Sequence, residues 1–119
     1  MDFYIGKPYS FRSFNCWDYV SLVREDNNIK TKQFQPLNLD NAFDMITAEM
    51  QKLGHGLSLV NSPRNFDIII VKKLGERTIY HCGIYYNGDV MHCSLAAKQV
   101  IKQTYNDFKK GYDELTIWR

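Results

Sequence analysis

The sequence predicts an α+β fold, in which helices from the first half of the chain pack on an antiparallel sheet formed by the second half. Three observations lead to this prediction. Apolar residues recur at helical spacing in the first half. Runs rich in β-branched and aromatic residues dominate from Phe66 onward. Between two of these runs stands Asn87-Gly88, the kind of dipeptide that favours a two-residue hairpin turn.

The size and charge of the chain exclude several classes of protein. A length of 119 residues without linker or repeat predicts one domain over 1–119. Fifteen basic residues oppose 13 acidic ones, and a formal charge of +2 is too small to indicate a nucleic-acid partner. The longest apolar run, Ile68–Val71, is far shorter than the ~20 residues of a membrane span. The first residues show no secretory signal, so we expect synthesis in the cytoplasm.

Two helices are expected in the first half. The first is predicted over 16–25, where Ser13 or Asn15 can cap the start and Asp18 places a negative charge in the first turn. Its apolar stripe consists of Trp17, Val20 and Val23 or Leu22. The second helix is predicted over 40–53, with the stripe Phe43, Ile46, Met50 and Leu53.

The second half predicts five strands, over 66–73, 77–86, 89–94, 98–103 and 114–118. Thr104, with Asp107 three residues later, can cap a short helix that runs through Phe108. The turn at Asn87-Gly88 also fixes which residues of the hairpin face each other.

This register places two histidines on one face of the hairpin. His81 and His92 become diagonal neighbours, with β-carbons within about 7–8 Å of each other. Gly83 would stand opposite His92 and leave space above this face. Cys82 would stand opposite Cys93 on the other face of the sheet.

The three cysteines predict neither a disulfide scaffold nor a metal site. Three is an odd number, and no secretory signal accompanies it. A Cys₂His₂ zinc site built from the hairpin residues is disfavoured because the cysteines and the histidines lie on opposite faces. Cys82 and Cys93 are therefore expected in the core, with a cross-strand disulfide as the minor alternative. No metal and no cofactor are expected.

Cys16 is the candidate nucleophile. It starts the first predicted helix, where unpaired N–H groups and the helix dipole stabilise a thiolate. His81 could act as its base, and His92 could orient His81, which is the arrangement of a thiol hydrolase. The alternative is that Cys16 and both histidines have only structural roles.

Several segments resemble the NlpC/P60 family of cysteine peptidases, in the family's order. Residues 14–20 are similar to the family's block around the nucleophile, and residues 63–69 to the start of the strand that follows. Residues 81–85 and 90–94 are similar to its histidine motifs. The end of the chain, 105–112 and 115–119, is similar to the family's terminal segment. The resemblance implies a papain-like fold, with N-terminal helices packed on a small antiparallel sheet.

The resemblance also implies roles and a substrate. By motif position, Cys16 would be the nucleophile, His81 the general base and His92 the orienting residue. Family members commonly hydrolyse amide bonds in the stem peptides of bacterial peptidoglycan. The small Cys-Trp-Asp form is similar to versions found in phage tails, which would add phage tail proteins as partners. The protein would then act in a virion or at the cell wall after delivery.

Three further residues are candidates for substrate binding. Tyr9 is similar to a tyrosine that lines the family's site. The family's Asp before and Ser after the nucleophile, which often meet the free amine of the substrate, are Asn15 and Trp17 here. The family's glycine at the start of the following strand is replaced by Phe66.

Two other functions remain open from the sequence. The chain could be a structural or tail-assembly protein that keeps the fold without the activity. It could also be an acyltransferase or deamidase that uses the same Cys–His site.

Overall fold

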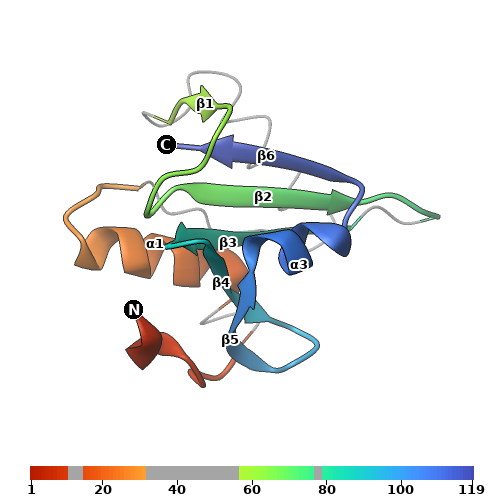
Figure 1. Cartoon of the computed structure of the whole chain (residues 1–119). Helices are drawn as coiled ribbons and strands as arrows, with labels where there is room; N and C mark the ends of the chain where they lie inside the picture. Colours follow the sequence, from red (N-terminus) through yellow and green to blue (C-terminus); the bar gives the residue numbers. More distant parts are fainter. Residues whose placement is uncertain (11–14, 32–56, 77–78) are drawn as a thin grey trace.

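The described part of the chain contains one six-stranded sheet and two α-helices (Figure 1). This computed structural model describes residues 1–10, 15–31, 57–76 and 79–119. The predicted α+β class is confirmed at this level. The helical elements are the 3-10 helix η1 (Asp2–Tyr4), α1 (Cys16–Asp26) and α3 (Tyr105–Lys110). The strands are β1 (Leu59–Val60), β2 (Ile68–Lys73), β3 (Ile79–Tyr86), β4 (Asp89–Ser94), β5 (Gln99–Thr104) and β6 (Glu114–Trp118).

The strand order is β1-β6-β2-β3-β4-β5, and every neighbouring pair is antiparallel. The last strand, β6, lies beside β2 rather than beside β5, because α3 carries the chain back across the sheet. The run of four buried residues at the start of β2 fits its place between β3 and β6.

Most of the predicted elements form close to their expected bounds. The helix predicted over 16–25 is α1, and the short helix capped by Thr104 is α3, where the threonine hydroxyl accepts from the Asp107 N–H. β1 and η1 were not predicted, since two or three residues are too few to show a period. The helix predicted over 40–53 lies outside the described residues.

The hairpin between β3 and β4 follows the predicted turn. Asn87 and Gly88 have φ angles of 49° and 88°, the left-handed conformation that such a turn requires. The pairs next to the turn have the predicted register: Tyr86 with Asp89, Tyr85 with Val90, and Ile84 with Met91.

The predicted register does not continue beyond these three pairs. The pairing of β3 with β4 ends at Ile84 and Met91, so Cys82 does not pair with Cys93 as expected. The predicted space above Gly83 is also absent. A β-carbon there would lie 2.7 Å from Val90 Cγ1 and 3.0 Å from His92 Cβ. Glycine is required because β4 crosses too closely for a side chain.

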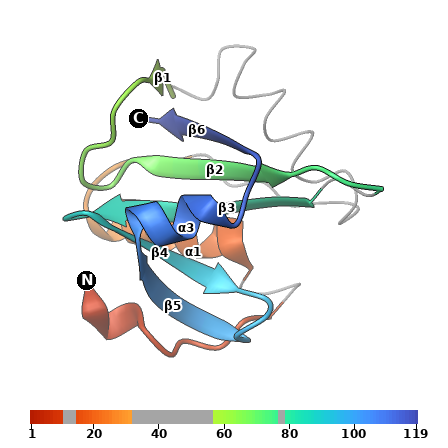
Figure 2. The same cartoon turned by 45° about the vertical axis from the view of Figure 1, so that its right-hand side comes forward.

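Apolar residues pack on both faces of the sheet, one face under each helix (Figure 2). On the α1 face, Trp17, Val20 and Val23 of the helix contact alternate residues of the central strands, including Cys82 and Cys93. On the other face, Phe108 of α3 completes a smaller cluster with Ile69, Val71, Val90 and Ile117. The two clusters hold the sheet between the helices.

Both edges of the sheet are formed or flanked by short segments. Next to β6 lies β1, which has only two residues. Along β5, Lys7 accepts from the Val100 N–H at 2.9 Å, and the Tyr9 N–H donates to Lys98 at 2.9 Å. Pro8 forms an isolated bridge with Gln99 in the same segment.

Candidate active site

Cys16 is the first residue of α1, as predicted, and its position is fixed by a capping box. The Asn15 side chain accepts from the N–H groups of Trp17 and Asp18, each at 3.0 Å, and Asp18 accepts from the Asn15 N–H at 3.1 Å. α1 packs against β3 and β4, which carry the two histidines. Cys16 is 5% exposed.

His81 and His92 were predicted to be diagonal neighbours, and they are in direct contact, although the register behind that prediction ends at Ile84 and Met91. His81 Nε2 lies 2.7 Å from His92 Nδ1, and the rings meet edge to face. This contact falls where β3 and β4 have stopped pairing, so the imidazoles join the two strands there. Because Nε2 of His81 is occupied by His92, Nδ1 is the nitrogen left to face Cys16.

The surroundings of Cys16 favour its thiolate. Burial alone would raise its pKa, but hydrogen bonds from Cys82 and His81 and the charge of His81 outweigh burial and lower the pKa to about 5. The thiol of Cys82 has the opposite shift, since burial and the neighbouring Cys16 raise its pKa. Of the two neighbouring thiols, Cys16 therefore ionises more readily than Cys82.

Cys82 has two roles in the structure, of which the sequence predicted one. It is fully buried in the α1-face cluster, as expected of a core cysteine. It also hydrogen-bonds to Cys16 through both its thiol and its backbone. The hairpin alternation could not reveal this contact, because it says nothing about where the start of α1 meets β3.

Two aromatic residues, Phe108 of α3 and Tyr112 just after it, lie next to the histidines, and sequence reasoning missed both contacts. The Phe108 ring lies 4.8 Å from the His92 ring, and the Tyr112 ring, just beyond α3, is stacked 6.3 Å from His81. Burial, followed by the charges of Cys16 and Cys82, raises the pKa of Tyr112, so its hydroxyl stays protonated. α3 thus shields the side of the imidazole pair that faces away from α1.

Gln103 of β5 was also missed. Its Oε1 lies 2.7 Å from His92 Nε2, so the polar chain extends from Cys16 through both histidines to β5. His92 pairs with Ile101, and Gln103 with Val90, so His92 and Gln103 are diagonal neighbours. The turn that sets this register, between β4 and β5, carries no dipeptide as informative as Asn87-Gly88.

The three predicted substrate-binding residues have different surroundings. Tyr9 is half-buried near Cys16: burial and then the charge of Cys16 raise its pKa. The side chain of Asn15 serves as the cap of α1. Trp17 is 2% exposed within the α1-face cluster. Substrate contact by these residues stays a prediction.

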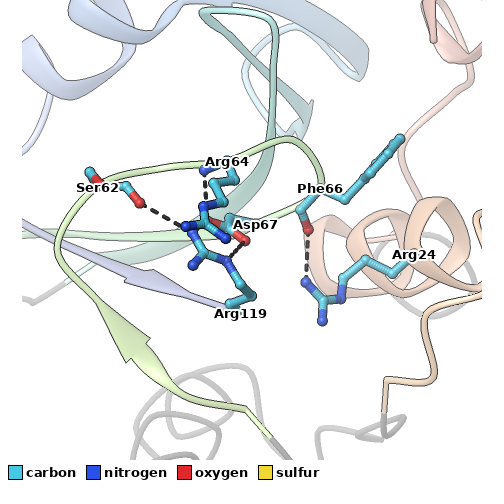
Figure 3. Close-up of polar contacts among 6 residues, drawn as sticks. All are labelled: Arg24, Ser62, Arg64, Phe66, Asp67 and Arg119. Carbon is cyan, nitrogen blue, oxygen red and sulfur yellow. Dashed lines mark hydrogen bonds and ion pairs between the residues drawn. The ribbon is translucent and has the colours of Figure 1, made fainter.

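A buried carboxylate and two arginines hold the start of β2 (Figure 3). The Asp67 carboxylate accepts two hydrogen bonds from the Arg119 guanidinium, at 3.0 and 2.7 Å, and one from the Arg64 N–H at 2.8 Å. Arg24 of α1 donates to the Phe66 carbonyl at 2.7 Å. These contacts tie the start of β2 to α1 and to the end of β6.

Within the described residues, no group of three or more His, Cys, Asp or Glu side chains is arranged to hold a metal ion. A search of the same residues for a helix of membrane-spanning length and hydropathy finds none.

Neither a scan against protein-family models nor a search of curated proteins finds a match to this chain.

Proposed function

We propose that this protein is a thiol hydrolase of the NlpC/P60 type, which cleaves amide bonds in the stem peptides of bacterial peptidoglycan. The observation that carries the proposal is the polar chain from Cys16 through His81 to His92, with a histidine–histidine distance of 2.7 Å and a lowered Cys16 pKa. A structural cysteine has no need of a base and an orienting residue in this order. The choice of substrate rests on the resemblance alone.

The first half of the reaction forms an acyl-enzyme. The Cys16 proton passes to His81 Nδ1, which gives a thiolate–imidazolium pair, and the sulfur attacks the carbonyl carbon of the scissile amide. The Asn15 side chain caps Trp17 and Asp18 and does not occupy the Cys16 N–H. That N–H can therefore donate to the developing oxyanion. His81 then protonates the leaving amine as the C–N bond breaks.

The second half releases the product. Water loses a proton to His81 and attacks the thioester carbonyl, and the carboxylic acid leaves as the Cys16 thiol is restored. His92, 4% exposed between His81, Gln103 and Phe108, keeps the His81 ring in one orientation throughout.

The test is incubation of the purified protein with bacterial muropeptides, followed by mass spectrometry. We expect the parent to release stem-peptide fragments with a new amine and a new carboxylate, and Cys16→Ala to release none. Cys93→Ala is the matched control, since it truncates another buried cysteine of the same core. Equal cleavage by parent and Cys16→Ala, or no cleavage by the folded parent, would contradict the proposal.

A further inference from the structure

The geometry around His92 assigns Gln103 as a positioning residue that selects the tautomer of both histidines, so that Nδ1 of His81 presents its lone pair to Cys16. The assignment rests on the proposed thiolate–imidazolium pair, and it holds whatever acyl substrate the thiolate attacks.

The chain of hydrogen bonds has a defined direction. Gln103 Oε1 is an amide oxygen and only accepts, so at 2.7 Å the His92 Nε2 must donate its proton to it. A neutral imidazole carries one proton, which leaves His92 Nδ1 as an acceptor. His81 Nε2, 2.7 Å away, must then be the donor. In neutral His81 the lone pair is therefore on Nδ1, where the Cys16 proton is received.

The opposite direction would disable the base. If the amide of Gln103 presented its NH₂ group, His92 Nε2 would accept and Nδ1 would carry the proton. His81 would then accept on Nε2 and carry its own proton on Nδ1, facing Cys16. A hydrogen bond that fixes the wrong tautomer is known to disable catalytic triads by orders of magnitude.

Among the described neighbours of His92, Gln103 is the one that can select its tautomer. From β3 it meets His81, and from α3 it meets the apolar ring of Phe108. Burial and the charge of His81 lower the pKa of His92 to about 4, while the Gln103 hydrogen bond acts in the opposite direction. His92 is therefore neutral at neutral pH, which the tautomer argument requires.

The experiment measures the state of Cys16 and His92 without any peptide substrate. Iodoacetamide alkylation of Cys16 is followed against pH, with the site located by peptide mass spectrometry, for Gln103→Leu, Gln103→Glu and the parent. Gln99→Leu, the same change at an exposed residue of β5, is the control. The tautomer of His92 is read in parallel from imidazole ¹⁵N chemical shifts.

We expect Gln103→Leu to slow alkylation at pH 6 by about tenfold, by analogy with the loss caused by removing the hydrogen-bond partner of a metal-binding histidine. Gln103→Glu keeps an acceptor and should alkylate faster at pH 6 than Gln103→Leu, although its negative charge also raises the pKa of His92. Alkylation of Gln103→Leu within twofold of the parent would overturn the assignment. So would a parent spectrum with the His92 proton on Nδ1, a result that needs no variant.

The two proposals fail in different ways. A parent with an ordinary thiol pKa at Cys16 contradicts the proposed thiol hydrolase and, with it, this role of Gln103. A reactive Cys16 whose alkylation rate does not change in Gln103→Leu contradicts only the positioning role of Gln103.

Discussion

Cys16 is almost completely buried and yet has a lowered pKa, and this pKa depends on two consecutive residues of β3, His81 and Cys82. Burial opposes ionisation, whereas the Cys82 thiol, the Cys82 backbone and His81 all favour the thiolate. A charge held in this way is sensitive to the loss of a single donor, because the desolvation penalty remains when the donor is gone.

Replacing Cys82 by alanine should therefore raise the pKa of Cys16. A hydrogen bond to a charged group contributes about 1.5 kcal/mol, which corresponds to a rise of about one pH unit. The measurement is the pH at which alkylation of Cys16 reaches half its maximal rate. Cys93→Ala serves as the control, and coincident profiles for the two variants would show that the Cys82 thiol does not act on Cys16.

At the scale of residues, the sequence was enough to predict the three central residues of the candidate site. It was not enough to predict the residues that hydrogen-bond to them. Cys16, His81 and His92 were predicted from a helix start, a hairpin register and a family resemblance, and the structure brings them together although that register ends at Ile84 and Met91. Gln103 and Cys82 could not be found, because their contacts depend on the β4–β5 register and on how α1 meets β3.

At the scale of elements, the start of β2 has an unusual backbone. Phe66 has a φ of 73°, a left-handed conformation that costs a residue with a β-carbon about 1 kcal/mol. Its N–H donates to the Tyr85 carbonyl at 2.8 Å, and its carbonyl accepts from Arg24 at 2.7 Å. These bonds, and the Phe66 contact with the Tyr86 ring, hold the conformation.

The variants Phe66→Gly and Phe66→Ala test this strain. Both lose the aromatic ring, but only glycine tolerates positive φ without cost. We expect Phe66→Gly to be the more stable variant by about 1 kcal/mol, the reverse of the usual order within regular structure. Urea unfolding measures the difference, and a more stable alanine variant would refute the strain.

Removing Arg119 and removing Asp67 should lower the free energy of unfolding by different amounts. Asp67 is 2% exposed and Arg119 is 36% exposed, so only the carboxylate depends on its partner for solvation. Arg119→Met should be the more destabilising change, because it leaves the buried carboxylate with only the Arg64 N–H and the more distant charge of Arg24. Asp67→Asn should cost less, because Arg119 can reach water. If urea unfolding gave the same loss of unfolding free energy for both variants, this difference would be contradicted.

The elements themselves were largely predictable, with clear reasons for the failures. The β-branched and aromatic runs on either side of the Asn87-Gly88 turn predicted the hairpin. They did not predict the point at which β3 and β4 separate. That point depends on the close crossing of β4 over Gly83, which follows from sheet coiling rather than from local sequence. The adjacency of β6 and β2 likewise has no local signal.

For the whole molecule, the buried imidazole makes stability depend on pH. Burial, together with the charge of His81, lowers the pKa of His92 from 6.5 to about 4. The unfolded chain therefore binds a proton at His92 below about pH 6.5, whereas the folded protein does so only below about pH 4. Between these values the unfolded state binds more protons, so acid favours unfolding.

The free energy of unfolding should fall as the pH is lowered from 6.5 to 4, with His92 contributing a loss of about 3 kcal/mol. His92→Gln lacks the titrating group and should show a shallower decline over the same range. Chemical unfolding at several pH values measures both slopes. Parallel curves for parent and variant would show that His92 is not buried in its neutral form.

The segments along the outer strands bear on how the protein behaves at high concentration. An exposed outer strand offers unpaired N–H and C=O groups to a second chain, which is how sheets join into aggregates. Here β5 already bonds to Lys7 and Tyr9, and Pro8 between them has no N–H to offer. On the other side, β1 is only two residues long. A second chain that paired with the start of β5 would have to displace the Lys7–Tyr9 segment, so this part of the edge carries its own protection against fibre formation.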